Sequence, residues 1–174
     1  SYTGLSFKTT AGTIEGWVKL NASGNTAEQY VATVKGLTSL NGDAYPDLFY
    51  GETTQMPVAH DSFIYFGGPN GIDPSNAAMK STIQTTVPRG TGMADMDGDG
   101  KIDLVISENS ANRVSIYYGP LQAGQAYTTP DVTLSVNSPQ GVALVDLDGD
   151  NDVDVVAAQY ASGNPVALFE NDGS

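Results

Sequence analysis

The sequence predicts an all-β protein built from repeated, blade-like sheets. The first observation is composition, since 20 Gly and 9 Pro among 174 residues suit many turns and short strands better than long helices. The second is that no stretch keeps a convincing helical period over 11 or more residues. The third is an aspartate-rich motif that returns about every 50 residues, each time followed by short apolar runs.

The repeat is clearest from the last aspartate of each motif, which falls at Asp47, Asp103 and Asp154. These positions are 56 and 51 residues apart. Such a spacing fits one four-stranded blade of a β-propeller better than one unit of a helical solenoid. We therefore predict β-propeller blades, about three four-stranded repeats in all.

Each motif is followed by β-prone runs in the same order. Strands are expected after the motifs at 48–50, 104–106 and 153–157, then at 63–66, 114–118 and 166–169, and further on at 81–87 and 132–136. Phe66, Tyr117, Tyr118 and Phe169 recur at blade spacing and are expected in the core between blades. Residues 76–79 could form at most one helical turn, and His60 is expected in a loop.

The chain reads as one domain with four parts. Residues 1–26 resemble two strands, at 5–9 and 13–20, that could complete a blade; 27–82 form the first repeat, 83–134 the second, and 135–174 a truncated third. Three repeats fall short of the usual 4–8 blades. The expected fold is therefore an incomplete ring, or part of a larger or oligomeric propeller. The chain begins with Ser1, and we expect any targeting segment to have been removed.

The net charge of −13 disfavours nucleic acid as a partner, because phosphate binding needs a basic surface. Many of the 20 acidic residues crowd into the three motifs, where like charges repel unless a cation lies among them. In the second motif Asp95, Asp97 and Asp99 stand at alternate positions and Asp103 ends the loop, and Lys101 could add its backbone carbonyl. In the third, Asp146, Asp148, Asp150 and Asp154 do the same, with the carbonyl of Asp152. Hard oxygen ligands without nitrogen or sulfur predict Ca²⁺.

The first motif is degenerate, since Ser39 replaces the first carboxylate. Asn41, Asp43, the Tyr45 carbonyl and Asp47 remain as ligands for a third, weaker site, and an Asx-turn without metal is the alternative. An EF-hand is rejected for the other two motifs, because its position-12 acid is replaced by Ile106 and Ala157 and strands follow instead of helices.

The two DxDGDxxxD loops and the turns after Phe66 and Tyr118 resemble the FG-GAP/VCBS repeats of integrin-α-like propellers, over about residues 27–174. The resemblance implies that Ca²⁺ braces the blades of an extracellular, secreted or cell-surface protein. It also implies recognition or adhesion, lectin-like or toward protein ligands.

Two alternatives remain beside a recognition module that binds carbohydrate or protein. One is a purely structural repeat segment of a larger secreted or surface protein. The other is a propeller-based hydrolase or lyase, although a single His and no Cys leave no visible catalytic constellation, so that no enzyme is expected. No apolar run reaches the roughly 18 residues of a membrane span. Two further residues are candidates for a role. Trp17 could stack on a sugar or pack in the interior, and Asn21 begins an N-glycosylation sequon.

Overall fold

A computed structural model describes residues 30–31, 38–52, 58–160, 163 and 165–173 of the chain. Within these ranges the chain forms three separate β-sheets, and the sole helix is the single 3₁₀ turn η1 (Ala77–Met79). The side chain of Asn76 caps this turn by accepting a hydrogen bond from the Ala78 amide at 3.1 Å. The expected all-β class is confirmed, and so is the one helical turn.

The first sheet has five strands in the order β1-β2-β3-β4-β8. Its members are β1 (Tyr30–Val31), β2 (Leu48–Gly51), β3 (His60–Tyr65), β4 (Lys80–Thr85) and β8 (Ala126–Tyr127). The first four pair antiparallel, whereas β8 pairs in parallel with β4. Strand β8 lies in the connection between β7 (Arg113–Tyr117) and β9 (Val132–Ser135) of the second sheet. Through β8, the second repeat therefore adds a strand to the outer edge of the first sheet.

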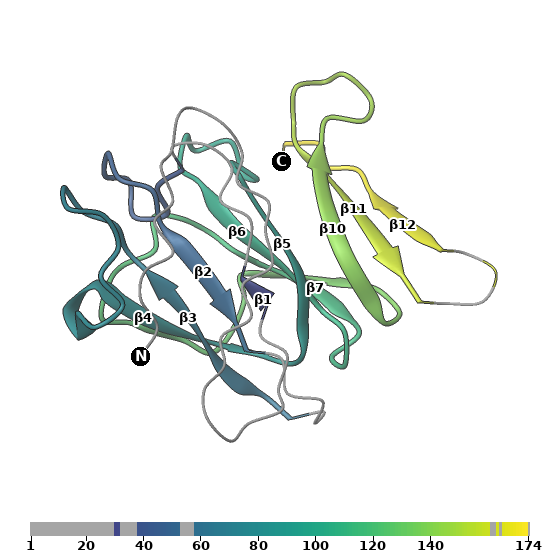
Figure 1. Ribbon diagram of the computed structural model, residues 1–174. Coiled ribbons are helices and arrows are strands. Elements are labelled where there is room, and N and C mark those ends of the chain that lie inside the picture. Colours follow the sequence, from purple (N-terminus) through teal and green to yellow (C-terminus); the bar gives the residue numbers. More distant parts are fainter. Residues whose placement is uncertain (1–29, 32–37, 53–57, 161–162, 164, 174) are drawn as a thin grey trace.

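The second and third sheets repeat one antiparallel arrangement. The second runs β5 (Pro88–Ala94), β6 (Asp103–Glu108), β7 (Arg113–Tyr117) and β9 (Val132–Ser135), and the third runs β10 (Pro139–Val145), β11 (Asp154–Gln159) and β12 (Val166–Phe169). Both sheets carry the same irregularity in their first strand, between Pro88 and Gly90 and between Pro139 and Gly141. The sheets stand side by side without closing into a ring (Figure 1), so they have the form of neighbouring propeller blades.

Two buried clusters join the sheets. The first cluster combines Leu40, Phe49, Ile64, Phe66 and Ile83 of the first repeat with Leu104, Ile106, Tyr117 and Leu121 of the second. The second cluster combines Met96, Val105, Val114, Ile116 and Val136 of the second repeat with Val155 and Ala157 of the third. The second sheet is thus apolar on both faces, which is why β6 and β7 are almost continuously buried. Of the four recurring aromatics, Phe66 and Tyr117 lie in the first cluster, while Tyr118 and Phe169 pack against the second, as expected.

The structure corrects two expectations. Strands β5 and β10, which lead directly into the second and third motifs, were not expected, since Pro88, Gly90 and Gly92 lack strand alternation. His60 is not a loop residue but the first residue of β3, where it pairs with Thr85 of β4. The two-residue strands β1 and β8 were not expected either, and the remaining strands match within a few residues. The strands expected at 5–9 and 13–20, together with Trp17 and Asn21, lie outside the described residues.

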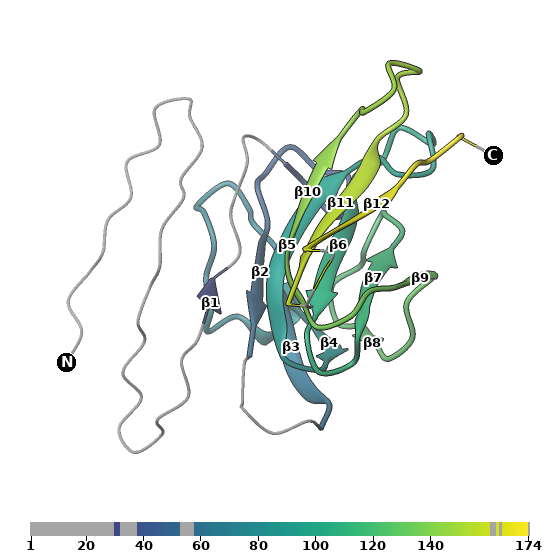
Figure 2. The same ribbon diagram turned by 90° about the vertical axis from the view of Figure 1, so that its right-hand side faces the viewer.

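The three motif loops lie at the same end of the sheets, at the top of Figure 1, and a quarter turn keeps the second and third at that end (Figure 2). This follows from topology, because the second and third loops each join the first two antiparallel strands of a sheet. Among the residues that the structure describes, no helix has the length and hydropathy that crossing a bilayer requires.

Candidate metal centres

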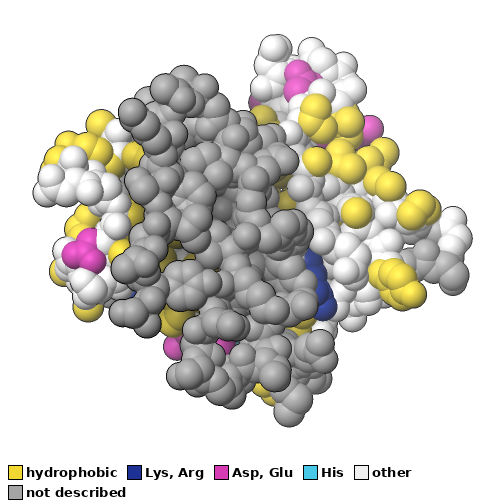
Figure 3. Space-filling model, viewed as in Figure 1, with side chains coloured by type: hydrophobic (Ala, Val, Ile, Leu, Met, Phe, Trp, Pro, Cys, Tyr) yellow, Lys and Arg dark blue, Asp and Glu magenta, His cyan; other side chains and the backbone are white. Residues whose placement is uncertain are grey.

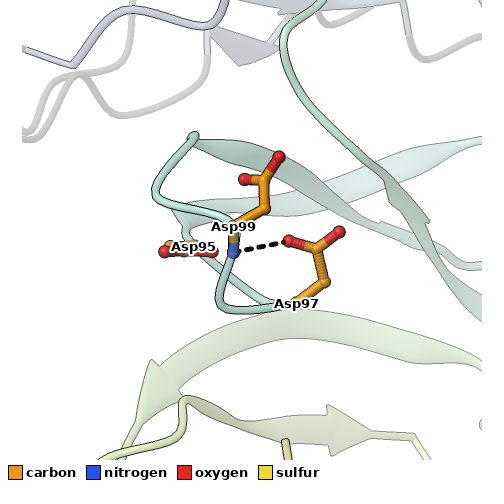
Figure 4. A group of neighbouring side chains, drawn as sticks. All are labelled: Asp95, Asp97 and Asp99. Carbon is orange, nitrogen blue, oxygen red and sulfur yellow. Dashed lines mark hydrogen bonds between the residues drawn. The ribbon is translucent and has the colours of Figure 1, made fainter. Parts of the chain in front are cut away.

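The second loop, Asp95–Asp103, joins β5 to β6 and curls around its own aspartates (Figure 4). Asp95, Asp97 and Asp99 each offer a carboxylate oxygen within 4.8 Å of the others. Loop amides orient all three, since Gly100 N donates to Asp95 Oδ2 at 2.9 Å, Asp99 N to Asp97 Oδ1 at 3.2 Å, and Lys101 N to Asp99 Oδ1 at 2.7 Å. The positive φ of 74° at Gly98 and 81° at Gly100 permits this tight curl.

The most informative atom of this loop is Asp95 Oδ1. It is buried and has no hydrogen-bond partner, although Oδ2 of the same carboxylate is held by Gly100. A buried carboxylate oxygen without a partner is costly, and such groups in proteins are normally paired or bound to a metal. Asp97 and Asp99 each bring a carboxylate oxygen within 4.8 Å of one of Asp95, so the loop presents an oxygen-rich position suited to a cation.

The third loop, Asp146–Asp154, repeats the arrangement between β10 and β11. Here the acids that converge within 4.8 Å are Asp146, Asp148 and Asp154. Amides of the loop again orient the side chains, with Gly149 N donating to Asp146 Oδ1 at 2.7 Å and Asp150 N to Asp148 Oδ1 at 3.2 Å. That second bond lowers the pKa of Asp148, but desolvation and the charges of Asp150 and Asp154 outweigh it and raise the pKa above its usual value. This repulsion is what a bound cation would relieve.

The two acidic groups do not contain every predicted ligand. Asp103 is outside the group of the second loop, and Asp150 is outside that of the third, where its Oδ1 accepts from Asp152 N at 2.9 Å. The ligand roles given to the backbone carbonyls of Tyr45, Lys101 and Asp152 stay predictions.

The first loop, Ser39–Asp47, is closed by its own hydrogen bonds. Ser39 Oγ donates to Asn41 Oδ1 at 2.7 Å, and Asn41 Nδ2 donates to Asp43 Oδ2 at 3.0 Å. Asp43 Oδ1 accepts from Tyr45 N at 2.7 Å, which is an Asx-turn. Neutral donors therefore lie where the other two loops have carboxylates, and the mutual repulsion of acids is absent from these positions.

The last aspartate of every loop has a second task that the sequence did not indicate. Asp47, Asp103 and Asp154 are fully buried, and each accepts backbone amides on both oxygens. One oxygen accepts from the second residue of the loop, at 2.6 Å from Leu40 and Met96 and 2.7 Å from Leu147. The other oxygen accepts from the turn that follows β3, β7 or β12, at 2.8 Å from Gly67 N, 2.7 Å from Gly119 N and 2.8 Å from Asn171 N.

These buried carboxylates therefore fasten each loop to the end of its own sheet. Desolvation raises the pKa of Asp47 and Asp103, although the two amides that each accepts lower it. The turn that supplies the second amide approaches closely, since a Cβ on Gly67 would lie 2.2 Å from the Pro46 carbonyl oxygen and one on Gly119 2.4 Å from that of Ile102. In the sequence, the only signal of this contact was the glycine that recurs in the turn. That its amide donates to the last aspartate of the loop could not be deduced without the fold.

Glu108, which recurs at the position of Glu52, has an architectural role. It is fully buried, its Oε1 accepts from Arg113 Nε at 2.9 Å, and its Oε2 accepts from Thr86 N at 2.6 Å. In the third repeat Gln159 occupies the matching place and accepts from Asn137 N at 3.2 Å. These bonds hold the segments that enter β5 and β10.

No curated protein matches the chain. Residues 95–157, from the first aspartate of the second loop into β11, match the family model of the FG-GAP-like repeat. This segment contains both acidic loops and the strands between them, and the all-β, blade-like sheets agree with it. Residues 95–157 are therefore similar to an FG-GAP-like repeat.

Proposed function

We propose that this protein binds two Ca²⁺ ions, one in the second loop and one in the third, and that these ions brace its blades. The observation that carries the proposal is the pair of acidic groups with the buried, unpartnered Oδ1 of Asp95. Burying a charged carboxylate oxygen without a partner costs free energy, and a bound cation or a hydrogen-bond donor offsets that cost.

Calcium is the ion that the donor set fits best. All side chains of the two groups are aspartates, and Ca²⁺ takes 6–8 oxygen ligands at flexible angles, whereas Mg²⁺ demands a near-octahedral shell. Zinc and copper prefer nitrogen or sulfur, and the chain has one His and no Cys.

Bracing follows from where the loops are attached. The second residue of the second loop is Met96, which is buried in the second cluster and donates its amide to Asp103. An ion that fixes the carboxylates of Asp95, Asp97 and Asp99 also fixes Met96 between the second and third sheets. Because the unfolded chain has no such loop, the ion stabilises the folded state by mass action.

The test is thermal unfolding of Asp97→Ala and Asp148→Ala in calcium and in a chelator. At a calcium concentration about tenfold above Kd, one site contributes about 1.4 kcal/mol, so each variant loses about that much in calcium and little in chelator. Asp61→Ala, an exposed acid outside the loops, is the control and changes neither. An equal loss in both buffers would show that these carboxylates act without a metal.

We further propose that the calcium-braced blades form a non-enzymatic, extracellular recognition module for a carbohydrate or protein ligand. The FG-GAP-like segment supports this, and extracellular calcium, at about millimolar levels, saturates sites of about 10⁻⁴ M. A glycan array run in calcium and in chelator tests the carbohydrate branch. A defined sugar bound in calcium alone supports a lectin-like module, and no binding in either buffer turns the search to protein ligands.

A second candidate is a structural segment of a larger assembly, with no ligand of its own. The specific observation in its favour is that the three sheets do not close a ring and that the third leaves an apolar face exposed. A protein that binds calcium but no glycan or protein ligand would support this candidate.

A further inference from the structure

The third sheet presents an apolar surface, which we call the open face. It consists of Val145, Leu147, Val156, Val166 and Leu168, of which all but Val156 are exposed. Val156 pairs with Leu168, and β12 alternates, so Val166 and Leu168 point to the same side of the sheet. Hydrophobic side chains gather over this part of the surface, at the right of Figure 3, where Figure 1 places β10, β11 and β12.

The same positions are buried in the other two sheets. Leu147 corresponds to Leu40 and Met96, which are 0% and 6% exposed, whereas Leu147 is 45% exposed. Leu168 corresponds to Ile64 and Ile116 by strand pairing, and the exposure rises from 0% and 5% to 62%. The open face is therefore a repeated packing surface that, in the third sheet, has no partner sheet among the described residues.

The chain itself shows what covers such a face. Leu104, Ile106 and Tyr117 of the second sheet cover the first, and Val155, Ala157 and Phe169, at the matching positions of the third sheet, cover the second. In the first sheet the matching residues are Leu48, Tyr50 and Tyr65. All three are half-buried, and none belongs to either cluster. The third sheet thus carries the open face, and the first sheet carries, on its other side, residues at the positions that cover such a face elsewhere in the chain.

We propose that the open face binds the first sheet of a second copy of this chain, head to tail, and that two copies close a six-bladed ring. The contact repeats, between chains, the packing already made twice within one chain. Such heterologous contacts either close into a ring or extend into a filament, and six blades fall within the usual 4–8. The contact is apolar; Leu147 belongs to the third loop, whereas Val166 and Leu168 lie on β12, outside the proposed calcium sites.

The first test is molecular mass by sedimentation equilibrium across a range of protein concentrations, in calcium. We expect a species of about twice 18.1 kDa that dissociates on dilution. Leu168→Glu, at a position already 62% exposed, folds and binds calcium as before but sediments as the monomer. Val58→Glu, at an apolar residue 53% exposed outside the open face, is the matched control and keeps the dimer.

The second test distinguishes head-to-tail packing from two open faces meeting each other. The chain has no Cys, so Leu168→Cys and Tyr65→Cys each introduce one thiol. With a short bismaleimide linker, an equal mixture should give a cross-linked dimer, and neither variant alone should do so.

Three results would overturn the proposal. A chain that stays at 18.1 kDa at every concentration has no such partner in itself, and the open face is then left to another protein or repeat. Cross-linking of Leu168→Cys alone would mean face-to-face packing, and a mass that keeps growing would mean an open filament. Calcium binding by Leu168→Glu, measured in the same samples, separates these failures from failure of the proposed calcium sites.

Discussion

Aspartates of the same loop do different work, and hydrogen bonding distinguishes them. Asp97 lies at the exposed end of the second loop and is held by one amide, whereas Asp103 is buried and accepts two. The first is a ligand of the proposed cation, whereas the second fastens backbone to backbone. Sequence spacing places both in one motif and gives no means of separating these roles.

Asp103→Asn is expected to destabilise the protein with or without calcium. The amide group presents an N–H to one of the two backbone donors, from Met96 or Gly119, and leaves that donor unsatisfied. A loss of about 1–3 kcal/mol is expected, measured by urea unfolding in chelator. The same assay on Asp97→Ala should show little change, and a calcium-dependent loss for Asp103→Asn would argue that it is chiefly a ligand.

The first loop is expected to bind no calcium, for a reason that a substitution can reverse. Ser39 Oγ donates to Asp43 Oδ1 at 3.3 Å and Asn41 Nδ2 donates to Asp43 Oδ2 at 3.0 Å, so we expect calorimetric titration of the natural chain to give two calcium ions. The double variant Ser39→Asp with Asn41→Asp removes these donors, restores the carboxylate pattern and should raise the stoichiometry to three. Ser39→Ala, which removes the donor without adding charge, is the control and should leave it at two. Three ions bound by the natural chain would contradict this account.

At the scale of elements, β5, the strand that enters the second loop, depends on glycine because it meets β10 of the neighbouring sheet. A Cβ on Gly90 would lie 2.7 Å from the Cα of Gly141, and one on Gly92 would lie 2.6 Å from Leu144 Cδ1. Strands β5 and β10 therefore approach more closely than side chains would allow. This explains why the sequence of β5 looks unlike a strand, since the packing of β5 requires the absence of side chains at Gly90 and Gly92.

Gly90→Ala and Gly141→Ala form a matched pair that tests this contact. The added methyl of Gly90→Ala meets the backbone of β10, whereas that of Gly141→Ala meets nothing within 4 Å. We expect Gly90→Ala to cost about 1–3 kcal/mol and Gly141→Ala to be near neutral, by thermal unfolding. Equal losses would mean that the effect lies in strand propensity and not in the approach of the two sheets.

For the molecule as a whole, stability should decline from the second sheet to the third. The second sheet is covered on both faces by the two clusters, whereas the third is covered on one face and, in the described residues, ends at β12 without a further strand. Local opening is easiest where few apolar contacts must be broken.

Hydrogen exchange of the dilute monomer measures this gradient. Amides of β12 should exchange well before those of β7, although both strands pair with the second strand of their sheet. Leu168→Glu should leave the difference in place under these conditions, because its side chain has no covering partner within the monomer. Equal protection of β12 and β7 would show that the open face is covered within the chain.

The sequence by itself determined the all-β class, the repeat, most strands and the two acidic loops, because each depends on local pattern. The spacing of Asp95, Asp97 and Asp99 on a glycine-bearing loop brings their oxygens together whatever surrounds the loop. The tertiary structure decided what depends on other parts of the chain. Strands β5 and β10, the amides on Asp103, and the burial of Met96 against the exposure of Leu147 all depend on which sheet lies alongside. The physical reason is that a loop's ligand geometry is local, whereas packing depends on neighbours distant in sequence.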